Sequence, residues 1–446
     1  MKHRLITTGF LLCCVLLQLP VHAQEQKKLT LADAVQLSLA NSKQLKNSSA
    51  RIAEATAVLQ QANDRKLPDF NINASYLRLT TPTISLKSKG SGSSDSSSGG
   101  GFGNVNQAMY AMATISYPIY SGSRIKYGIE SARYLQQASL LDSAHDRGEV
   151  IINTIGAYIN LYKAGEAVQL VKENLAQSRQ RDTDFANLEK NGILARNDLL
   201  KAQLQTSNIE LSLLDAENNW KLANVNMNLL LGLPESTILE LDSASLAYAP
   251  ELKTVDEYEQ IALQNRKDML ALSNRAKAAA SNIKSVKGEY YPSIGLTGGY
   301  AAINIPGLAA VTNAIDVGVG VKYSLSSLWK TKAKLKEAQA KEDELVSNEE
   351  LLVDNMHFQV NQAYENYLLS IKKIDVYTKA IEQANENYKI TKNKYDNQLA
   401  TTTDLLEADV AQLQAKLNYA FAKADAVVAY NKLIQTAGIL TEPTNK

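Results

Sequence analysis

The chain contains two copies of one pattern, and this repeat restricts its fold more than any other feature of the sequence. Residues 29–76 align without a gap to residues 253–300, at an offset of 224 positions. From about residue 115 onward the second copy follows at an offset of 206 positions. The two offsets differ by about the length of segment 87–104, rich in Ser and Gly, which we expect to be a flexible loop enlarged in the first copy. An offset sustained over so many residues predicts two copies of one structural unit.

The N-terminus has the features of a secretory signal peptide at residues 1–23. A basic start precedes a short apolar run and a cleavage site of small residues. The only two cysteines, Cys13 and Cys14, lie inside this segment. A mature chain without cysteine has no disulfide, no thiolate nucleophile and no Cys-based metal site. Its basic and acidic residues are nearly balanced, which gives no indication of a nucleic-acid partner.

Most of the remaining sequence has a helical pattern, because Ala, Leu, Gln, Lys and Glu are abundant while Gly and Pro are scarce. Residues 124–190 contain no Pro and predict one helix of about 100 Å, at 1.5 Å per residue. Its apolar residues form narrow seams, as in Ile152, Ile155 and Ile159, which is typical of coiled-coil packing. Residues 330–397 are the same helix in the second copy.

Four other segments alternate between apolar and polar residues, which predicts strands. The segments are about 69–80, 105–120, 293–305 and 313–326. Their length of about ten residues is that of strands in a membrane barrel, although a soluble sheet packed on helices has the same alternation. Tyrosines near the strand ends favour the membrane, because aromatic residues concentrate at its interfaces. The tyrosines are Tyr76, Tyr117, Tyr300 and Tyr323.

Four strands are too few to close a barrel. An open sheet edge in lipid leaves backbone groups without hydrogen bonds, so a membrane sheet of this size requires several chains. Two chains would give eight strands, whose interior is largely filled by side chains, and three would give twelve. A conducting pore favours the larger number.

The order, spacing and duplication of several short motifs resemble the TolC family of outer-membrane efflux channels over nearly the whole mature chain. The motifs are Leu-Thr-Leu-Ala-Asp-Ala at residues 29–34, Leu-Pro at 67–68, Tyr-Pro-Ile-Tyr-Ser-Gly at 117–122, the turn sequence at 191–200 and Leu-Leu-Gly at 230–232. The resemblance implies a mainly α-helical fold with a membrane β-barrel and an internal two-fold repeat. The repeats would be residues 24–250 and 251–440, followed by a tail at residues 441–446.

The resemblance also implies an assembly and its partners. Three copies would form a homotrimer with one twelve-stranded barrel in the lipid of the outer membrane and a periplasmic α-barrel of long helical hairpins. A periplasmic adaptor (membrane fusion protein) and an inner-membrane transporter of the RND, ABC or MFS type would dock on it. The chain would then be the exit duct of a tripartite efflux or type I secretion system. The alternative is a periplasmic coiled-coil scaffold or adaptor without a pore.

The resemblance places a gate at the turns of the helical hairpins. Asp404 and Glu407 match two acidic residues that ring the narrowest point, and a spacing of three puts both on one helix face. Such a ring attracts cations, and crowding of like charges raises the pKa of some of its members. The alternative is that Asp404 is only a helix N-cap beside Thr403.

Further candidates lie at the same turns. Tyr395 and Asp198 match a pair that latches the closed state, while the partner of Asn197 in a second link is Ala400 here instead of an Arg. The candidates for adaptor contact at the tips are Gly192, Ile193, Leu194 and Leu399. A plain helix-connecting turn also explains a Gly at residue 192.

The sequence shows no constellation of catalytic residues. Only His145 and His357 remain after the signal peptide, and the repeat offset does not relate them. We therefore expect no catalytic site, no metal site, no cofactor and no enzymatic activity.

Overall fold

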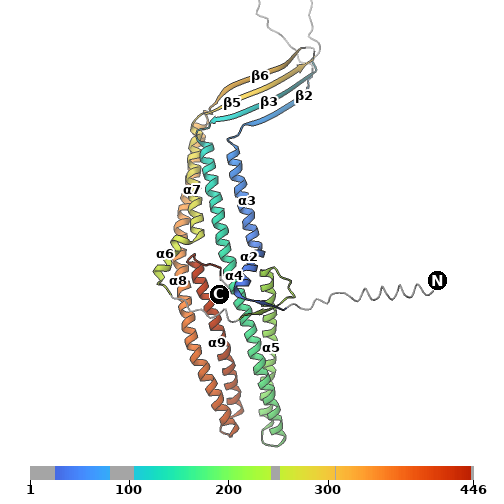
Figure 1. The fold of residues 1–446 in the computed structure, drawn as a ribbon, viewed down its shortest axis with the longest axis vertical. Helices are drawn as coiled ribbons and strands as arrows, with labels where there is room; N and C mark the ends of the chain where they lie inside the picture. Colours follow the sequence, from blue (N-terminus) through green and yellow to red (C-terminus); the bar gives the residue numbers. More distant parts are fainter. Residues whose placement is uncertain (1–25, 81–104, 243–251, 307, 443–446) are drawn as a thin grey trace, which may run out of the picture. The chain divides into compact units, whose positions relative to one another are not determined.

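The structure is a computed structural model that describes residues 26–80, 105–242, 252–306 and 308–442. The predicted signal peptide and the Ser- and Gly-rich loop lie outside these residues, as do residues 443–446 of the predicted tail. The chain divides into two compact units, whose helices and strands are labelled in Figure 1. Unit 1 comprises Met1–Ser48, Ser143–Lys267 and Val353–Lys446, and unit 2 comprises Ser49–Asp142 and Asp268–Leu352.

Unit 2 contains a four-stranded antiparallel sheet in the order β2-β3-β5-β6. The strands are β2 (Asp69–Arg78), β3 (Gln107–Tyr120), β5 (Ser293–Ile305) and β6 (Ala309–Lys322). Directly paired residues share a face of a sheet, so the register decides what each face carries. Ile72 pairs with Ala113, Ala113 with Tyr300, and Tyr300 with Ile315. The register therefore brings most apolar residues of the four alternating segments to one face, while most of their polar residues and four glycines lie on the other.

The fourth strand differs from its prediction. Alternation predicts residues 313–326, whereas β6 runs from Ala309 to Lys322. Pairing starts at Ile305 and Ala309 across a tight turn, which adds residues at the beginning. At the other end Ser327 N donates to Ser324 O at 2.9 Å, in a turn that starts the next helix and removes residues 323–326 from the strand.

The helices attached to the sheet are α3 (Lys43–Asp64), α4 (Arg124–Lys190), α7 (Lys267–Lys287) and α8 (Ser327–Asp396). A short 3₁₀ helix, η2 (Gly288–Tyr290), separates α7 from β5. Helix α4 has the bounds that its Pro-free sequence predicts, and α8 begins and ends within a few residues of its prediction. Helices α3, α4 and α8 continue from one unit into the other.

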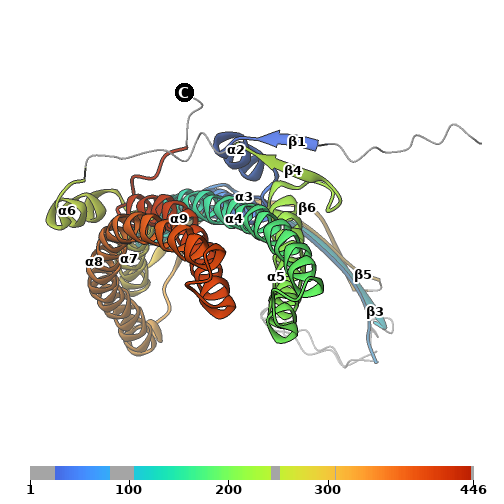
Figure 2. The ribbon, with the colours of Figure 1, turned by 90° about the horizontal axis from the view of Figure 1, so that it is seen from below.

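In unit 1 the C-terminal end of α4 is joined by a turn to α5 (Arg196–Leu231), and that of α8 is joined by a turn to α9 (Thr402–Thr436). Figure 2, which looks along these helices, shows α8, α9, α4 and α5 in one row. On one side of the row lie α2 (Leu31–Asn41) and a parallel pair of short strands, β1 (Gln26–Leu29) and β4 (Ile238–Leu241). Helix α6 (Val255–Asn265) is closed at its start by a capping box between Thr254 and Glu257.

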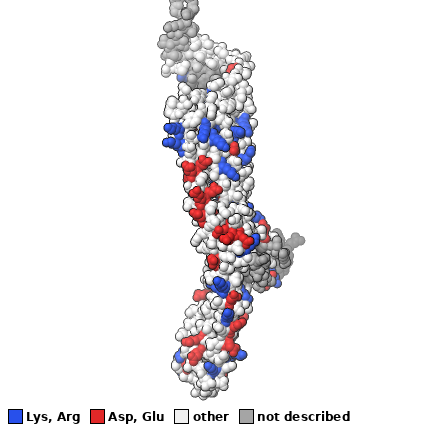
Figure 3. Space-filling model, turned by 90° about the vertical axis from the view of Figure 1, so that its left-hand side faces the viewer, with Lys and Arg blue, Asp and Glu red and all other residues white. Residues whose placement is uncertain are grey.

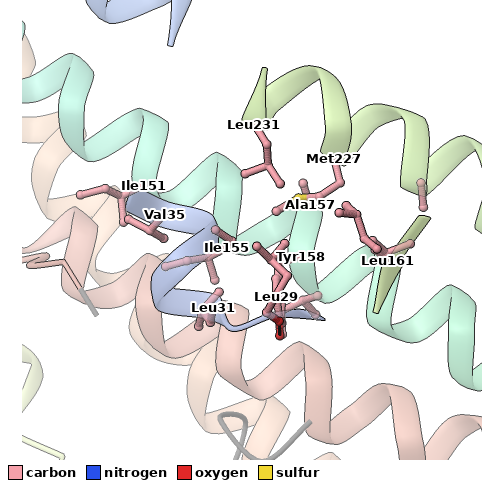
Figure 4. Close-up of a cluster of buried hydrophobic side chains, with 14 of the residues drawn as sticks. Leu29, Leu31, Val35, Ile151, Ile155, Ala157, Tyr158, Leu161, Met227 and Leu231 are labelled. Carbon is pink, nitrogen blue, oxygen red and sulfur yellow. Dashed lines mark hydrogen bonds between the residues drawn. The ribbon is translucent and has the colours of Figure 1, made fainter. Parts of the chain in front are cut away.

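The main hydrophobic core of unit 1 lies where β1, β4 and α2 pack on α4 and α5 (Figure 4). Its centre is Tyr158, which is fully buried among Leu29, Ile155 and Met227. The Tyr158 hydroxyl lies 3.0 Å from Leu29 O and 3.1 Å from Asp242 O. This one buried hydroxyl is therefore a hydrogen-bond partner for a carbonyl of β1 and for the carbonyl that follows β4.

The repeat is visible in a close backbone approach that both copies share. Gly232 ends α5 with a φ of 70°, and a Cβ there would lie 2.8 Å from Asn41 Cβ. Gly438 has a φ of 74°, and a Cβ there would lie 2.8 Å from Arg266 N. The positive φ and the close approach require glycine at both positions.

Candidate functional site

The first helical tip is the turn between α4 and α5. Gly192 has a φ of 75°, Gly192 N donates to Glu189 O and Ile193 N donates to Leu188 O, both at 2.9 Å. These bonds satisfy the last carbonyls of α4. The side chain of Ile193 is 64% exposed, while Leu194 packs partly against Phe185 and Leu199.

The second tip, between α8 and α9, repeats this geometry at the offset of 206. Gln398 takes the place of Gly192 with a φ of 60°, and Leu399 N donates to Lys394 O at 2.8 Å. Leu399 corresponds to Ile193 and is 77% exposed. Each tip thus presents one apolar side chain to solvent, and adaptor contact by Gly192, Ile193, Leu194 and Leu399 stays a prediction.

The structure places Asp404 in a capping box at the start of α9. Thr401 is the N-cap, and Asp404 Oδ2 accepts from Thr401 N and from Thr401 Oγ1, both at 2.8 Å. These hydrogen bonds lower the pKa of the exposed Asp404 carboxyl below its ordinary value of 3.8. The alternative of an N-cap at Asp404 beside Thr403 is therefore wrong, because the cap lies three residues earlier.

The first copy lacks both the capping box and the second acidic residue. Ala195 stands where Thr401 caps α9, so α5 has no side-chain cap. Asp198 instead accepts a hydrogen bond from Lys201 Nζ at 3.1 Å. Lys201 corresponds to the exposed Glu407, so only the second copy presents two acids on one helix face.

Tyr395 lies between the two tips. Its ring stacks on Phe185 of α4, with centroids 5.4 Å apart. Burial is the main cause of a raised pKa at Tyr395, a hydrogen bond with Thr402 opposes it, and the negative charge of Asp198 adds to it. Tyr395 and Asp198 are thus close within one protomer, but the described hydrogen bond of Asp198 goes to Lys201. Asn197 is exposed, and the latch stays a prediction.

The sequence analysis missed a buried ionic contact between α4 and α9. Asp409 is 1% exposed and accepts from Arg181 Nη2 at 2.6 Å and from Asn174 Nδ2 at 3.0 Å. Arg181 Nε is buried and has no partner among the described residues. The available signal was an Asp four residues after Leu405, in the apolar seam of α9, where an unpaired charge is not tolerated.

The sheet of unit 2 exposes its apolar face. Val317 is 85% and Ile315 is 76% exposed, although both belong to the alternating run of apolar residues from Ile315 to Val321 on one face of β6. Three of the four predicted interface tyrosines lie in strands; Tyr323 directly follows β6, and Tyr300 lies in the middle of β5 because that strand continues to Ile305. Their role at a membrane interface stays a prediction.

The polar face ends in an open cavity of about 700 Å³ at the edge that meets the helices. Its charged lining residues are Arg65, Asp69, Arg124, Glu289 and Lys322. In the part of the chain that the structure describes, no group of three metal-ligating side chains occurs. Within the same residues, none of the helices has a stretch apolar and long enough to span a bilayer.

An exposed apolar strand face together with long helical hairpins defines an outer-membrane channel protein with a periplasmic extension. The family model described as outer membrane efflux protein matches residues 34–233 and 259–439. The chain therefore belongs to this family of efflux channels. Its place is the outer membrane, and its function is that of an exit duct for efflux. The resemblance to TolC is confirmed.

Individual relatives are distant in sequence and close in fold. Outer membrane efflux protein BepC of Brucella suis biovar 1 (strain 1330) is 22% identical over 336 residues, which cover 72% of this chain and 70% of BepC. The outer-membrane channel OprN is similar with a TM-score of 0.77 at 18% identity, over 92% of this chain and 89% of OprN. The open state of the MtrE outer membrane channel of Neisseria gonorrhoeae has a TM-score of 0.74 at 18% identity, over 93% of this chain and 91% of MtrE.

Proposed function

We propose that three copies of this chain close one twelve-stranded barrel in the outer membrane and one α-barrel in the periplasm. The observation that carries the proposal is the sheet with an exposed apolar face and two open edges. Among the described residues β2 pairs only with β3, and β6 pairs only with β5. In lipid each open edge would leave a row of backbone groups without hydrogen bonds, so β2 of one chain pairs with β6 of the next.

The polar face supports a water-filled interior. The four glycines Gly295, Gly299, Gly318 and Gly320 lie on this face. Asp316 lies across from Gly299, where a Cβ on Gly299 would approach Asp316 Oδ1 to 2.7 Å. Small residues facing inward favour a barrel wide enough for passage, and eight strands would leave little room.

The organisation of the chain follows from the same proposal. After a signal peptide at residues 1–23, the first repeat occupies 24–250 and the second 251–440, with a tail at 441–446. The two segments matched by the family model fall one in each repeat, which supports the division. Each repeat supplies one hairpin of strands and one helical tip.

The tips are proposed to act as the gate and the docking surface. Three copies of Asp404 and Glu407 form an acidic ring that attracts cations, and Tyr395, Asp198 and Asn197 hold the closed state. Ile193 and Leu399, exposed at the turns, meet the periplasmic adaptor of an inner-membrane transporter. Substrates pass from that transporter through the duct without chemical change.

Cysteine pairs test the assembly, since a chain with cysteines only in its predicted signal peptide gives a clean background. Asn73→Cys in β2 combined with Cys at Asp316, Gly318 or Gly320 in β6 should give disulfide-linked trimers on oxidation. The matched control is Ala111→Cys with Ala302→Cys, which are paired within one chain and should form only intramolecular bonds. If no β2–β6 pair links different chains, the shared barrel is excluded.

A further inference from the structure

Exposed lysines surround the edge of the sheet that meets the helices. The strands alternate in direction, so the end of α3, the start of α4, the end of α7 and the start of α8 all meet this edge. We call these exposed lysines the basic collar. They are Lys66, Lys126, Lys284, Lys287, Lys330, Lys332 and Lys336.

The collar is not used in ion pairs within the chain. None of its lysines has a carboxylate partner among the residues that the structure describes. By contrast Lys334, on the same turn of α8, lies 2.8 Å from Glu289 Oε2. Lys126 and Lys284 lie 5.6 Å and 5.5 Å from the ring of Tyr127, a contact that leaves their charge available to an anion.

Helix stability does not explain the collar on α4 and α8. Both helices begin here, and the N-terminus of a helix carries partial positive charge, so nearby lysines are unfavourable. Neither helix has an acidic residue in its first turn. A helix start that carries lysines and no acid instead attracts anions. The lysines at the end of α7 are favourable for that helix and carry less weight.

The charge along α8 changes sign with distance from the sheet. From Ser327 to Lys336 the helix contains four lysines and no acid. From Glu337 to Glu350 it contains six acids and one lysine. Figure 3 shows basic residues gathered near the sheet and acidic residues further down the same face. An anionic surface at the sheet edge would attract the first segment and repel the second.

An aromatic and apolar belt adjoins the collar on the sheet side. Tyr291 is 58%, Trp329 is 65% and Leu325 is 65% exposed, and beyond them the apolar face of the strands begins. Tyr and Trp concentrate where a bilayer meets water. The order from apolar strands through aromatic residues to lysines is therefore the order of acyl chains, interface and phosphate groups.

We propose that the basic collar binds the anionic headgroups of phospholipids in the periplasmic leaflet of the outer membrane. This inference rests on the proposed function, which places the sheet in the bilayer and the helices in the periplasm. The collar lies at the helix edge of the sheet, so its partners belong to the leaflet on the periplasmic side and not to the lipid of the outer leaflet. Each basic side chain near an anionic surface contributes about fivefold in binding, which corresponds to about 1 kcal/mol.

The test compares lipid retention by two variants of the full chain, each with four Lys→Gln changes. The collar variant changes Lys126, Lys287, Lys332 and Lys336. The control variant changes four exposed lysines of α8 in unit 1, namely Lys372, Lys373, Lys379 and Lys392. Each purified channel is mixed with equal amounts of phosphatidylglycerol and phosphatidylcholine, and bound lipids are counted by native mass spectrometry. A parallel sample contains lipopolysaccharide.

We expect wild type and control to retain more phosphatidylglycerol than phosphatidylcholine. In the collar variant the ratio of the two bound lipids should fall at least about tenfold. Equal preference in both variants would overturn the inference, and so would a collar effect confined to lipopolysaccharide. The trimer mass in the same spectra and the channel conductance are measured on the same samples. If trimers and conductance are normal while the lipid preference is unchanged, only the collar inference fails. If trimers do not form in wild type, the proposed function fails first.

Discussion

Asp409 shows how one buried carboxylate joins the two helical hairpins of unit 1. It holds Arg181 and Asn174 of α4 from a position on α9 that is otherwise apolar. Breaking a buried pair leaves an uncompensated charge, whereas an exposed pair contributes little. Unit 1 offers both cases between the same two helices, because Lys163 and Asp425 also form a pair at 2.7 Å with Asp425 57% exposed.

Asp409→Ala should destabilise the protein by about 3–5 kcal/mol, because Arg181 stays buried without its partner. Asp425→Ala is the matched control and should cost less than about 1 kcal/mol. Denaturant titration followed by circular dichroism measures both. If the two variants are equally stable, the Asp409 contact contributes no more than a surface ion pair. Asp409→Leu with Arg181→Met should recover most of the loss.

Asp404 and Glu407 are expected to give the trimeric channel its cation preference. In the Glu407→Gln variant only Asp404 supplies the cation preference. This preference should persist to a pH below 3.8, the ordinary pKa of an aspartate, because hydrogen bonds from Thr401 lower the pKa of Asp404. A lowered pKa means that the charge and the capping box are present above it and are lost as pH falls through it. Reversal potentials in planar bilayers across a pH series measure this preference.

The matched control is Lys201→Gln, at the equivalent position of the first copy, which should leave the preference at least as strong as in wild type. The double variant Asp404→Asn with Glu407→Gln should show little preference at any pH. A double variant as selective as wild type would show that the acidic ring lies elsewhere.

At the scale of elements, strand register determines the two faces of the sheet. A shift of one residue would exchange the faces, so Val317 would point into water and Gly318 into lipid. These neighbours therefore test which face meets the membrane. Around Gly318 a Cβ would find Thr297 Oγ1 at 3.9 Å, an ordinary contact, so a side chain can be added there.

Val317→Lys should impair insertion and trimer formation, since a lysine on the lipid face costs about 2–4 kcal/mol near the middle of a bilayer. Gly318→Lys, one residue further along β6, should insert normally because its side chain faces the interior. The yield of cross-linked trimer in outer-membrane fractions measures both. Equal yields, or the reverse order, would contradict the assignment of the faces.

At the scale of the whole molecule, we propose that contacts between the helical tips hold the closed state. Tyr395 is held by stacking on Phe185 and is influenced by Thr402 and Asp198 through its hydroxyl. Tyr395→Phe keeps the stacking and removes only the hydroxyl. We expect this variant to raise the open fraction of single channels several-fold, as a lost hydrogen bond of about 1 kcal/mol would do.

Tyr377→Phe, on the same helix α8, is the control and should leave the open fraction unchanged. Single-channel recording at fixed voltage gives both values. An open fraction in Tyr395→Phe equal to that of the control would remove the hydroxyl of Tyr395 from the latch.

The long helices and the strands were predictable because their signals are local. The Pro-free stretch 124–190 and the alternation around Val317 depend on neighbouring residues only. The parallel pair of β1 and β4 was not predicted, because each strand has four residues, too few for a period to be recognised, and the partners lie far apart in the chain. Arg181 and Asp409 also lie far apart in the chain, so their pairing was not predicted.

The sequence alone determined the two-fold repeat, the long helices, the alternating strands and the positions of the tips, since each is a periodic or local pattern. Only the tertiary structure decided that Thr401 and not Asp404 caps α9, that Asp409 is a buried partner of Arg181, and that lysines of α4, α7, α8 and the turn after α3 meet at one sheet edge. These features bring together residues distant in the chain or depend on backbone hydrogen bonds. Their free energies come from burial and spatial proximity, which a linear pattern does not contain.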